Sequence, residues 1–266
     1  MISLEGFPWF DTAAGPMLTL LLVSAFFAAH FLFNPTRMAR ARMTREAARL
    51  GIDYRPPAGN GHGKKVDEGP HRYAGKNADI AWQLEILVLA PPTQDNAASA
   101  SRSYSRWTCG VPLKNLAPTD YLLLMRLPES FVHPGVHRCE SAKSGLEPFN
   151  ALRNKVSALA YLLYVRSFFG DARAAGLAFS PTHRCLSGDD GLDRQYTIFC
   201  NAPDGLAGLS ADTRAVLGAL QELQLAVLWD ARGLAMSCPT AFNTAADVAR
   251  FAEIGVRLAQ LAAPPP

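Results

Sequence analysis

The sequence lacks the short motifs that mark the commonest enzymes. It has no GxxxxGK[ST] loop, and no GxGxxG stands between a strand and a helix, so no familiar nucleotide site is expected. It also has no GxSxG elbow, HExxH pair or CxxC pair. We therefore name no catalytic residue and expect a noncatalytic protein rather than an enzyme.

Cysteine is scarce and irregularly placed, which excludes the disulfide framework of a small secreted domain. The five cysteines, an odd number, are scattered from residue 109 onward: Cys109, Cys139, Cys185, Cys200 and Cys238. Cysteine often acts as a small buried apolar residue. We expect free thiols in a reducing cytoplasm.

Basic residues are absent before Arg37, and this absence excludes a cleaved signal peptide, which needs a basic start. Residues 16–33 form an uncharged, largely apolar run of eighteen residues, long enough as a helix to cross the hydrocarbon core of a bilayer. The sequence thus predicts an N-terminal transmembrane helix at 16–33, preceded by an outer tail at 1–15.

The stretch at 34–50 is rich in arginine and is expected to be a juxtamembrane helix ending at Gly51. It holds one acid, Glu46, and five arginines: Arg37, Arg40, Arg42, Arg45 and Arg49. These arginines either contact anionic lipid phosphates at the membrane surface or serve only as a topology signal. Either interpretation places the chain in a bacterial inner membrane, with its N-terminus outside and its C-terminal domain in the cytoplasm.

Residues 51–70 are rich in Gly and Pro and predict a linker, followed by a cytosolic domain at 71–263. From residue 51 onward the chain holds 21 basic and 20 acidic residues, a balance that argues against a nucleic-acid partner. Ile80 to Val88 alternate in polarity, which indicates a half-buried strand in a hairpin at 71–89. Further strands are expected at 104–111, 121–127 and 194–200, with a hairpin at 225–238.

Helices are predicted at 150–169, at 210–223 with Ser210 as N-cap, and from Asn243 or Thr244 to about 262. In the first of these, Leu159 and Leu163 belong to a series at helical spacing. The last helix has one apolar stripe: Val248, Phe251, Gly255, Leu258 and Ala262. This order predicts an α+β fold with a mainly antiparallel sheet packed with about three helices. A helix-grip fold and a pleckstrin-like barrel both remain open.

A pair of similar segments is the main candidate for chemistry. His-Arg-Cys-x-Ser occurs at 137–141 and again at 183–187, and each copy continues to Gly-Leu-acid. Six of eleven positions are identical at a spacing of 46. Imidazole and thiolate are ligands that zinc and copper prefer. One hypothesis is a shared metal or thiol-redox site made by His137, Cys139, His183 and Cys185. The other is that these are structural histidines and buried thiols, with no cofactor.

The chain resembles bacterial single-pass, membrane-anchored proteins of unknown function. The segments that carry the resemblance are 71–75, 192–198 leading into Cys200, and 225–236. The resemblance implies no activity, so no catalytic residue follows from it. The leading hypothesis is an inner-membrane-anchored protein whose cytosolic domain binds a lipid or a membrane or cytosolic protein. The alternative is a membrane-tethered metal-binding or thiol-redox protein that uses the two His-Arg-Cys segments.

Overall fold

The structure, a computed structural model, describes residues 20, 21, 23, 24, 35–57, 69–89, 102–126, 159, 161–180, 183–220 and 223–263. The chain divides into two units, Met1–Glu46 and Ala47–Pro266. In the first unit the main described element is most of helix α2, Pro35–Arg49. The second unit holds the sheet and all the remaining elements described below.

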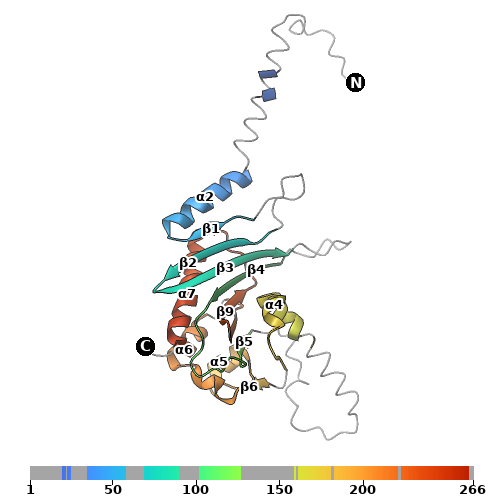
Figure 1. The fold of residues 1–266 in the computed structure, drawn as a ribbon, viewed down its shortest axis with the longest axis vertical. Coiled ribbons are helices and arrows are strands. Elements are labelled where there is room, and N and C mark those ends of the chain that lie inside the picture. Colours follow the sequence, from blue (N-terminus) through green and yellow to red (C-terminus); the bar gives the residue numbers. More distant parts are fainter. Residues whose placement is uncertain are drawn as a thin grey trace, which may run out of the picture. The chain divides into compact units, whose positions relative to one another are not determined.

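Within the described residues, nine strands form one antiparallel sheet, in agreement with the predicted α+β class (Figure 1). The strand order is β1-β2-β3-β4-β9-β8-β5-β7-β6. The bounds are β1 Asp53–Arg55, β2 His71–Asn77, β3 Ile80–Leu89, β4 Arg102–Cys109, β5 Leu122–Met125, β6 Arg184–Cys185, β7 Thr197–Cys200, β8 Ala226–Asp230 and β9 Gly233–Cys238. The two predicted hairpins are confirmed as β2–β3 and β8–β9, and β4 joins them by pairing with both β3 and β9.

The helices of this unit are short, apart from the last one. They are α4 Asp171–Ala174, α5 Asp190–Gln195, α6 Ala211–Ala219 and α7 Ala245–Ala262, with a 3-10 turn at Pro203–Gly208 and a further helical stretch at 161–169. Ser210 caps α6 by accepting a hydrogen bond from the Thr213 N–H at 3.1 Å. Thr244 caps α7 in the same way, from the Asp247 N–H at 3.1 Å. Both caps satisfy N–H groups that a helix start leaves unpaired.

Helix α7 covers one face of the sheet with the predicted apolar stripe. Val248, Phe251, Gly255, Leu258 and Ala262 are all buried. Gly255 lies directly against Trp107 of β4 and Met236 of β9, which are register partners. A glycine here lets the helix backbone approach the indole ring closely, so that the largest side chains of the sheet fit beneath α7.

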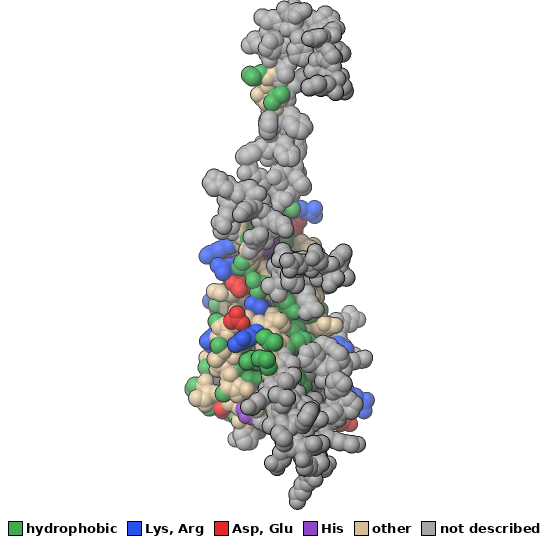
Figure 2. Space-filling view, turned by 90° about the vertical axis from the view of Figure 1, so that its right-hand side faces the viewer, with side chains coloured by type: hydrophobic (Ala, Val, Ile, Leu, Met, Phe, Trp, Pro, Cys, Tyr) green, Lys and Arg blue, Asp and Glu red, His purple; other side chains and the backbone are tan. Residues whose placement is uncertain are grey.

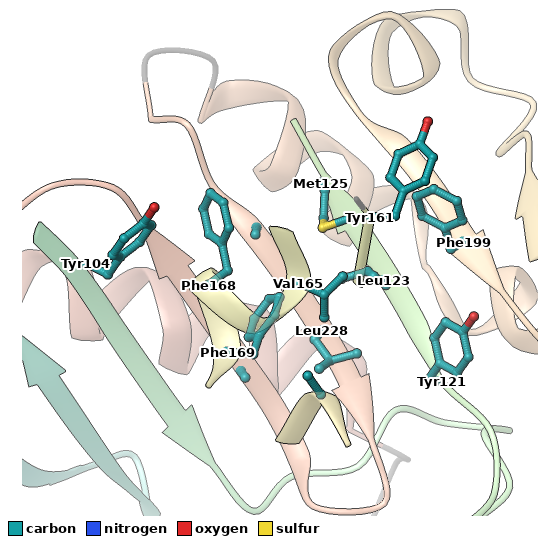
Figure 3. Packing of buried hydrophobic residues seen from close by; sticks show 13 residues of the cluster. Tyr104, Tyr121, Leu123, Met125, Tyr161, Val165, Phe168, Phe169, Phe199 and Leu228 are labelled. Carbon is teal, nitrogen blue, oxygen red and sulfur yellow. The ribbon is translucent and has the colours of Figure 1, made fainter. Parts of the chain in front are cut away.

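The opposite face of the sheet is covered by aromatic side chains of the helical stretch at 161–169 (Figure 3). Tyr161, Val165 and Phe168 of this stretch pack with Tyr104 of β4 and Phe199 of β7. The rings of Tyr161 and Phe199 meet edge to face at 5.5 Å between centroids, a favourable arrangement for aromatic pairs. The central strands β8 and β9 are therefore buried on both faces.

Two arginines fix this aromatic helix and α4 to the sheet. Arg106 of β4 donates to the carbonyls of Phe168 at 2.6 Å and Ser167 at 2.7 Å, at the C-terminal end of the helix, where carbonyls lack intrahelical partners. Burial lowers the pKa of Arg106, while nearby Glu85 opposes that shift. Arg173 of α4 forms a buried bidentate ion pair with Asp230 of β8, at 2.8 and 2.6 Å.

The predicted N-terminal transmembrane helix is not supported. Among the described residues, no helix is both long enough and apolar enough to cross a membrane, and only residues 20, 21, 23 and 24 of the predicted span are described. A membrane helix needs about 20 consecutive apolar residues, which none of the described helices provides. The fold class is corrected to α+β without this helix. The single-pass inner-membrane location, with its N-terminus outside, depended on the helix and is corrected with it.

Two smaller predictions also need correction, and one strand was not predicted. Arg194 and Gln195 end helix α5 instead of beginning a strand, and β7 starts only at Thr197. Strand β1 lies inside the stretch 51–70 that was predicted to be a linker, and it pairs with β2. The two-residue strand β6 was not foreseen. These short elements depend on tertiary pairing, because their own sequences are too brief to show a period.

Candidate functional site

The second His-Arg-Cys copy lies at an edge of the sheet, where Arg184 and Cys185 form strand β6. His183 directly precedes this strand, and its Nδ1 lies 2.9 Å from the hydroxyl oxygen of Tyr121. The Cys185 thiol faces the carbonyl of Ile198 on β7, at 3.8 Å. Both predicted ligands of this copy therefore already have partners within the protein.

The serine and the acid of the same copy build a turn. Asp193 of α5 accepts hydrogen bonds from the Ser187 hydroxyl and from the Ser187 N–H, both at 2.8 Å. Asp189 caps α5 by accepting from the N–H groups of Gly191 at 2.9 Å and Leu192 at 3.2 Å. The pattern His-Arg-Cys-x-Ser followed by Gly-Leu-Asp is thus explained locally as a strand, a turn and a helix start.

The first copy, with His137 and Cys139, lies outside the described residues, so the shared four-ligand site stays a prediction. Across the ranges that the structure does describe, no three His, Cys, Asp or Glu side chains are grouped so as to hold a metal ion. His183 and Cys185 alone provide two ligands, whereas structural zinc sites use four.

The environment of Cys185 favours a protonated thiol. Burial raises its pKa to about 11, with smaller contributions from nearby Cys200 and Asp193. Burial also raises the pKa of the neighbouring Tyr121 hydroxyl. Because the thiolate is the reactive form and the metal ligand, this environment opposes both reactions that the paired segments suggested.

A direct test follows from the raised pKa of Cys185. At pH 8, we expect iodoacetamide to alkylate Cys185 about 100-fold more slowly in the folded chain than in urea, because two pH units separate its pKa from an ordinary thiol. Mass spectrometry of the Cys185 peptide gives both rates. The folded rate should keep rising up to about pH 11. Fast alkylation at pH 8 would contradict the structure and favour the thiol-redox alternative.

The arginine-rich stretch is helical, as predicted, and forms α2. Arg42 donates to Glu46 at 2.7 Å, one turn further along, and its side chain is 79% exposed. Arg45 and Arg49 are also exposed, whereas Arg40 is half-buried. Arg37 lies in the first turn of the same helix. The prediction that these five arginines contact lipid phosphates stays a prediction.

A feature that the sequence did not reveal is the outward side of the helical stretch at 161–169. Leu159 and Leu163 were part of the predicted helical series, but they point to solvent, with exposed fractions of 56% and 54%. Tyr161, Val165 and Phe168 face the core instead. The signal was present in the composition, because residues 159–169 contain only two side chains, Arg166 and Ser167, that are neither apolar nor aromatic.

On the face drawn in Figure 2, the described side chains of both charges are mixed. Basic and acidic side chains lie close together there, with apolar side chains among them. Two such pairs, Arg72 with Glu85 at 2.9 Å and Lys76 with Asp79 at 2.9 Å, lie on the β2–β3 hairpin. Exposed pairs of this kind contribute little to stability and do not mark a ligand site.

Comparisons with known proteins give little. No family model matches the chain, and no curated protein matches it. Among solved structures, the crystal structure of the mycobacterial trehalose monomycolate transport factor A is similar, with a TM-score of 0.39 and 9% identity. The match covers 86% of this chain and 98% of that chain. A likeness at this level supports no conclusion about fold or function.

Proposed function

We propose that this chain is a noncatalytic binding protein whose α+β domain binds a partner protein through Leu159 and Leu163, on the outward face of the helix that includes 161–169. The observation behind the proposal is the exposed pair Leu159 and Leu163, one helical turn apart on the side away from the sheet. A helix that is apolar on all sides is normally buried on all sides. Among the described residues, Tyr161, Val165 and Phe168 of this helix are buried against the sheet, whereas Leu159 and Leu163 are exposed.

Burying Leu159 and Leu163 against a partner would contribute to the free energy of binding. Burying a leucine fully stabilises a complex by about 1.5–3 kcal/mol, so the exposed halves of two leucines provide roughly 2 kcal/mol. Paired apolar anchors at i and i+4 are the pattern by which a helix fits an apolar groove. The partner is therefore expected to offer an apolar groove long enough for two leucines that lie one helical turn apart.

The test is a quantitative pull-down with the tagged full chain. Leu159→Glu combined with Leu163→Glu places two charges in the proposed interface and is expected to reduce capture of the specific partner at least tenfold. Leu186→Glu is the matched control, since Leu186 is 72% exposed and follows β6, away from this helix in the sequence. Circular dichroism should show both variants folded, because all three leucines are exposed.

Two outcomes would overturn the proposal. One is capture of the same proteins in equal amounts by the wild type, the double variant and the control. The other is recovery of further copies of this chain only, with an oligomer that the double variant dissociates. That result would make the helix a self-association surface.

A further inference from the structure

One side of α2 carries three exposed arginines in a row. Met38, Arg42, Arg45 and Arg49 recur at intervals of four, three and four residues, which places them on one side of the helix. All four side chains are exposed. We name Arg42, Arg45 and Arg49 the arginine face. With five arginines and one glutamate, α2 has a net charge of +4.

Contacts within α2 indicate which chemical group pairs with the arginine face. The guanidinium of Arg42 already pairs with a carboxylate of its own helix, Glu46, at 2.7 Å. Arg45 donates Nε to the carbonyl of Ala41 at 3.2 Å, which aligns its side chain along the helix axis. Planar guanidinium groups bind carboxylates through paired hydrogen bonds. A row of carboxylates at matching intervals would therefore pair with the arginine face.

We propose that the arginine face of α2 binds an acidic helical segment of a partner protein. Met38 and the three arginines repeat along one side of α2 at intervals of four, three and four, so a partner helix with glutamates at the same intervals places a carboxylate opposite each arginine. A lipid surface fits less well, because an interfacial helix needs a broad apolar side, and beyond its arginines and methionines α2 has only alanine, threonine, proline and Glu46. A single-stranded nucleic acid would need aromatic side chains for stacking, and the α2 sequence has none.

The experiment is fluorescence anisotropy with the full chain and a labelled, alanine-based helical peptide that has glutamates at intervals of four, three and four. Replacing Arg45 and Arg49 with glutamine (R45Q/R49Q) is expected to weaken binding about tenfold, since two exposed ion pairs of up to about 1 kcal/mol each are lost. The matched control is R250Q/R257Q, which changes two exposed arginines of α7 and should leave binding unchanged. Glu46→Gln should tighten binding two- to threefold, because it removes the competing carboxylate.

A second peptide with glutamine in place of glutamate, and a titration with salt, separate charge pairing from other contacts. Binding should disappear with the first and weaken with the second. The proposal is overturned if both arginine variants behave alike. It is also overturned if R45Q/R49Q loses binding to phosphatidylserine vesicles or to an oligonucleotide while the acidic peptide fails to bind the wild type. These results are independent of the leucine pair, so either proposal can fail alone.

Discussion

Asp230→Ala is expected to lower the free energy of unfolding by about 3–5 kcal/mol. The carboxylate of Asp230 accepts two hydrogen bonds from Arg173 and a third from the Arg232 N–H, at 2.8 Å. Side-chain exposure of Arg173 is 9%, so removing the carboxylate leaves a buried charge without its counterion. Breaking a buried pair on one side costs this much because the remaining charge stays desolvated.

Urea unfolding followed by circular dichroism measures this change. The informative control removes both charges at once, with Arg173→Met and Asp230→Leu in one chain. A buried pair replaced by apolar residues of similar size often costs little, so the double variant should be more stable than Asp230→Ala. If Asp230→Ala unfolds at the wild-type urea concentration, then Arg173 and Asp230 do not hold α4 against the β8–β9 hairpin.

The strands and helices that could be predicted from the sequence are those with one face buried and the other exposed to solvent. Strand β3 is the clearest case: Trp82, Leu84 and Ile86 are buried, whereas Ala81 before them and Gln83 among them are exposed. The amino-acid sequence of this strand shows the same alternation of apolar and polar residues. Helix α7 was equally clear, because its stripe at helical spacing and its Thr244 cap agree with each other.

The helical stretch at 161–169 shows why the apolar period can mislead. Leucines at helical spacing drew attention to one side of the helix, but tyrosines and phenylalanines on the other side are larger and form denser packing. A helix that is apolar all round has no unique inward side in its sequence. Only the sheet's own surface, with Tyr104 and Phe199, selected the aromatic side.

The paired His-Arg-Cys segments show the corresponding limit for sites. Residue types and spacing suggested ligands, yet in the second copy the hydroxyl beside His183 belongs to Tyr121, just before β5, and the carbonyl beside Cys185 belongs to Ile198 of β7. Sequence spacing does not reveal such partners. The Ser187–Asp193 contact, in contrast, is local. A serine followed six residues later by an acid occurs in both segments, so this contact could be inferred from the sequence.

Gly233→Ala is expected to lower the free energy of unfolding by about 2–5 kcal/mol, because backbone strain and overpacking act together. Gly233 closes the turn of the β8–β9 hairpin with φ at 94°, a conformation that costs an L-residue about 1–2 kcal/mol. An added Cβ would also meet backbone, lying 2.7 Å from the Gly110 carbonyl carbon and 2.8 Å from the Val111 nitrogen, with Cys109 O closer still. Backbone atoms cannot rotate away as a side chain can, so overpacking adds roughly 1–3 kcal/mol.

Two other glycines separate the two causes. Gly188 has φ at 75° but open space around it, so Gly188→Ala should cost only the backbone strain, about 1 kcal/mol. Gly218 of α6 has open space and no positive φ, so alanine should stabilise the helix by up to about 1 kcal/mol. The expected order of urea midpoints is therefore Gly218→Ala above wild type, Gly188→Ala slightly below, and Gly233→Ala far below. Equal midpoints for the last two variants would mean that β9 does not approach the 109–111 backbone as closely as this register requires.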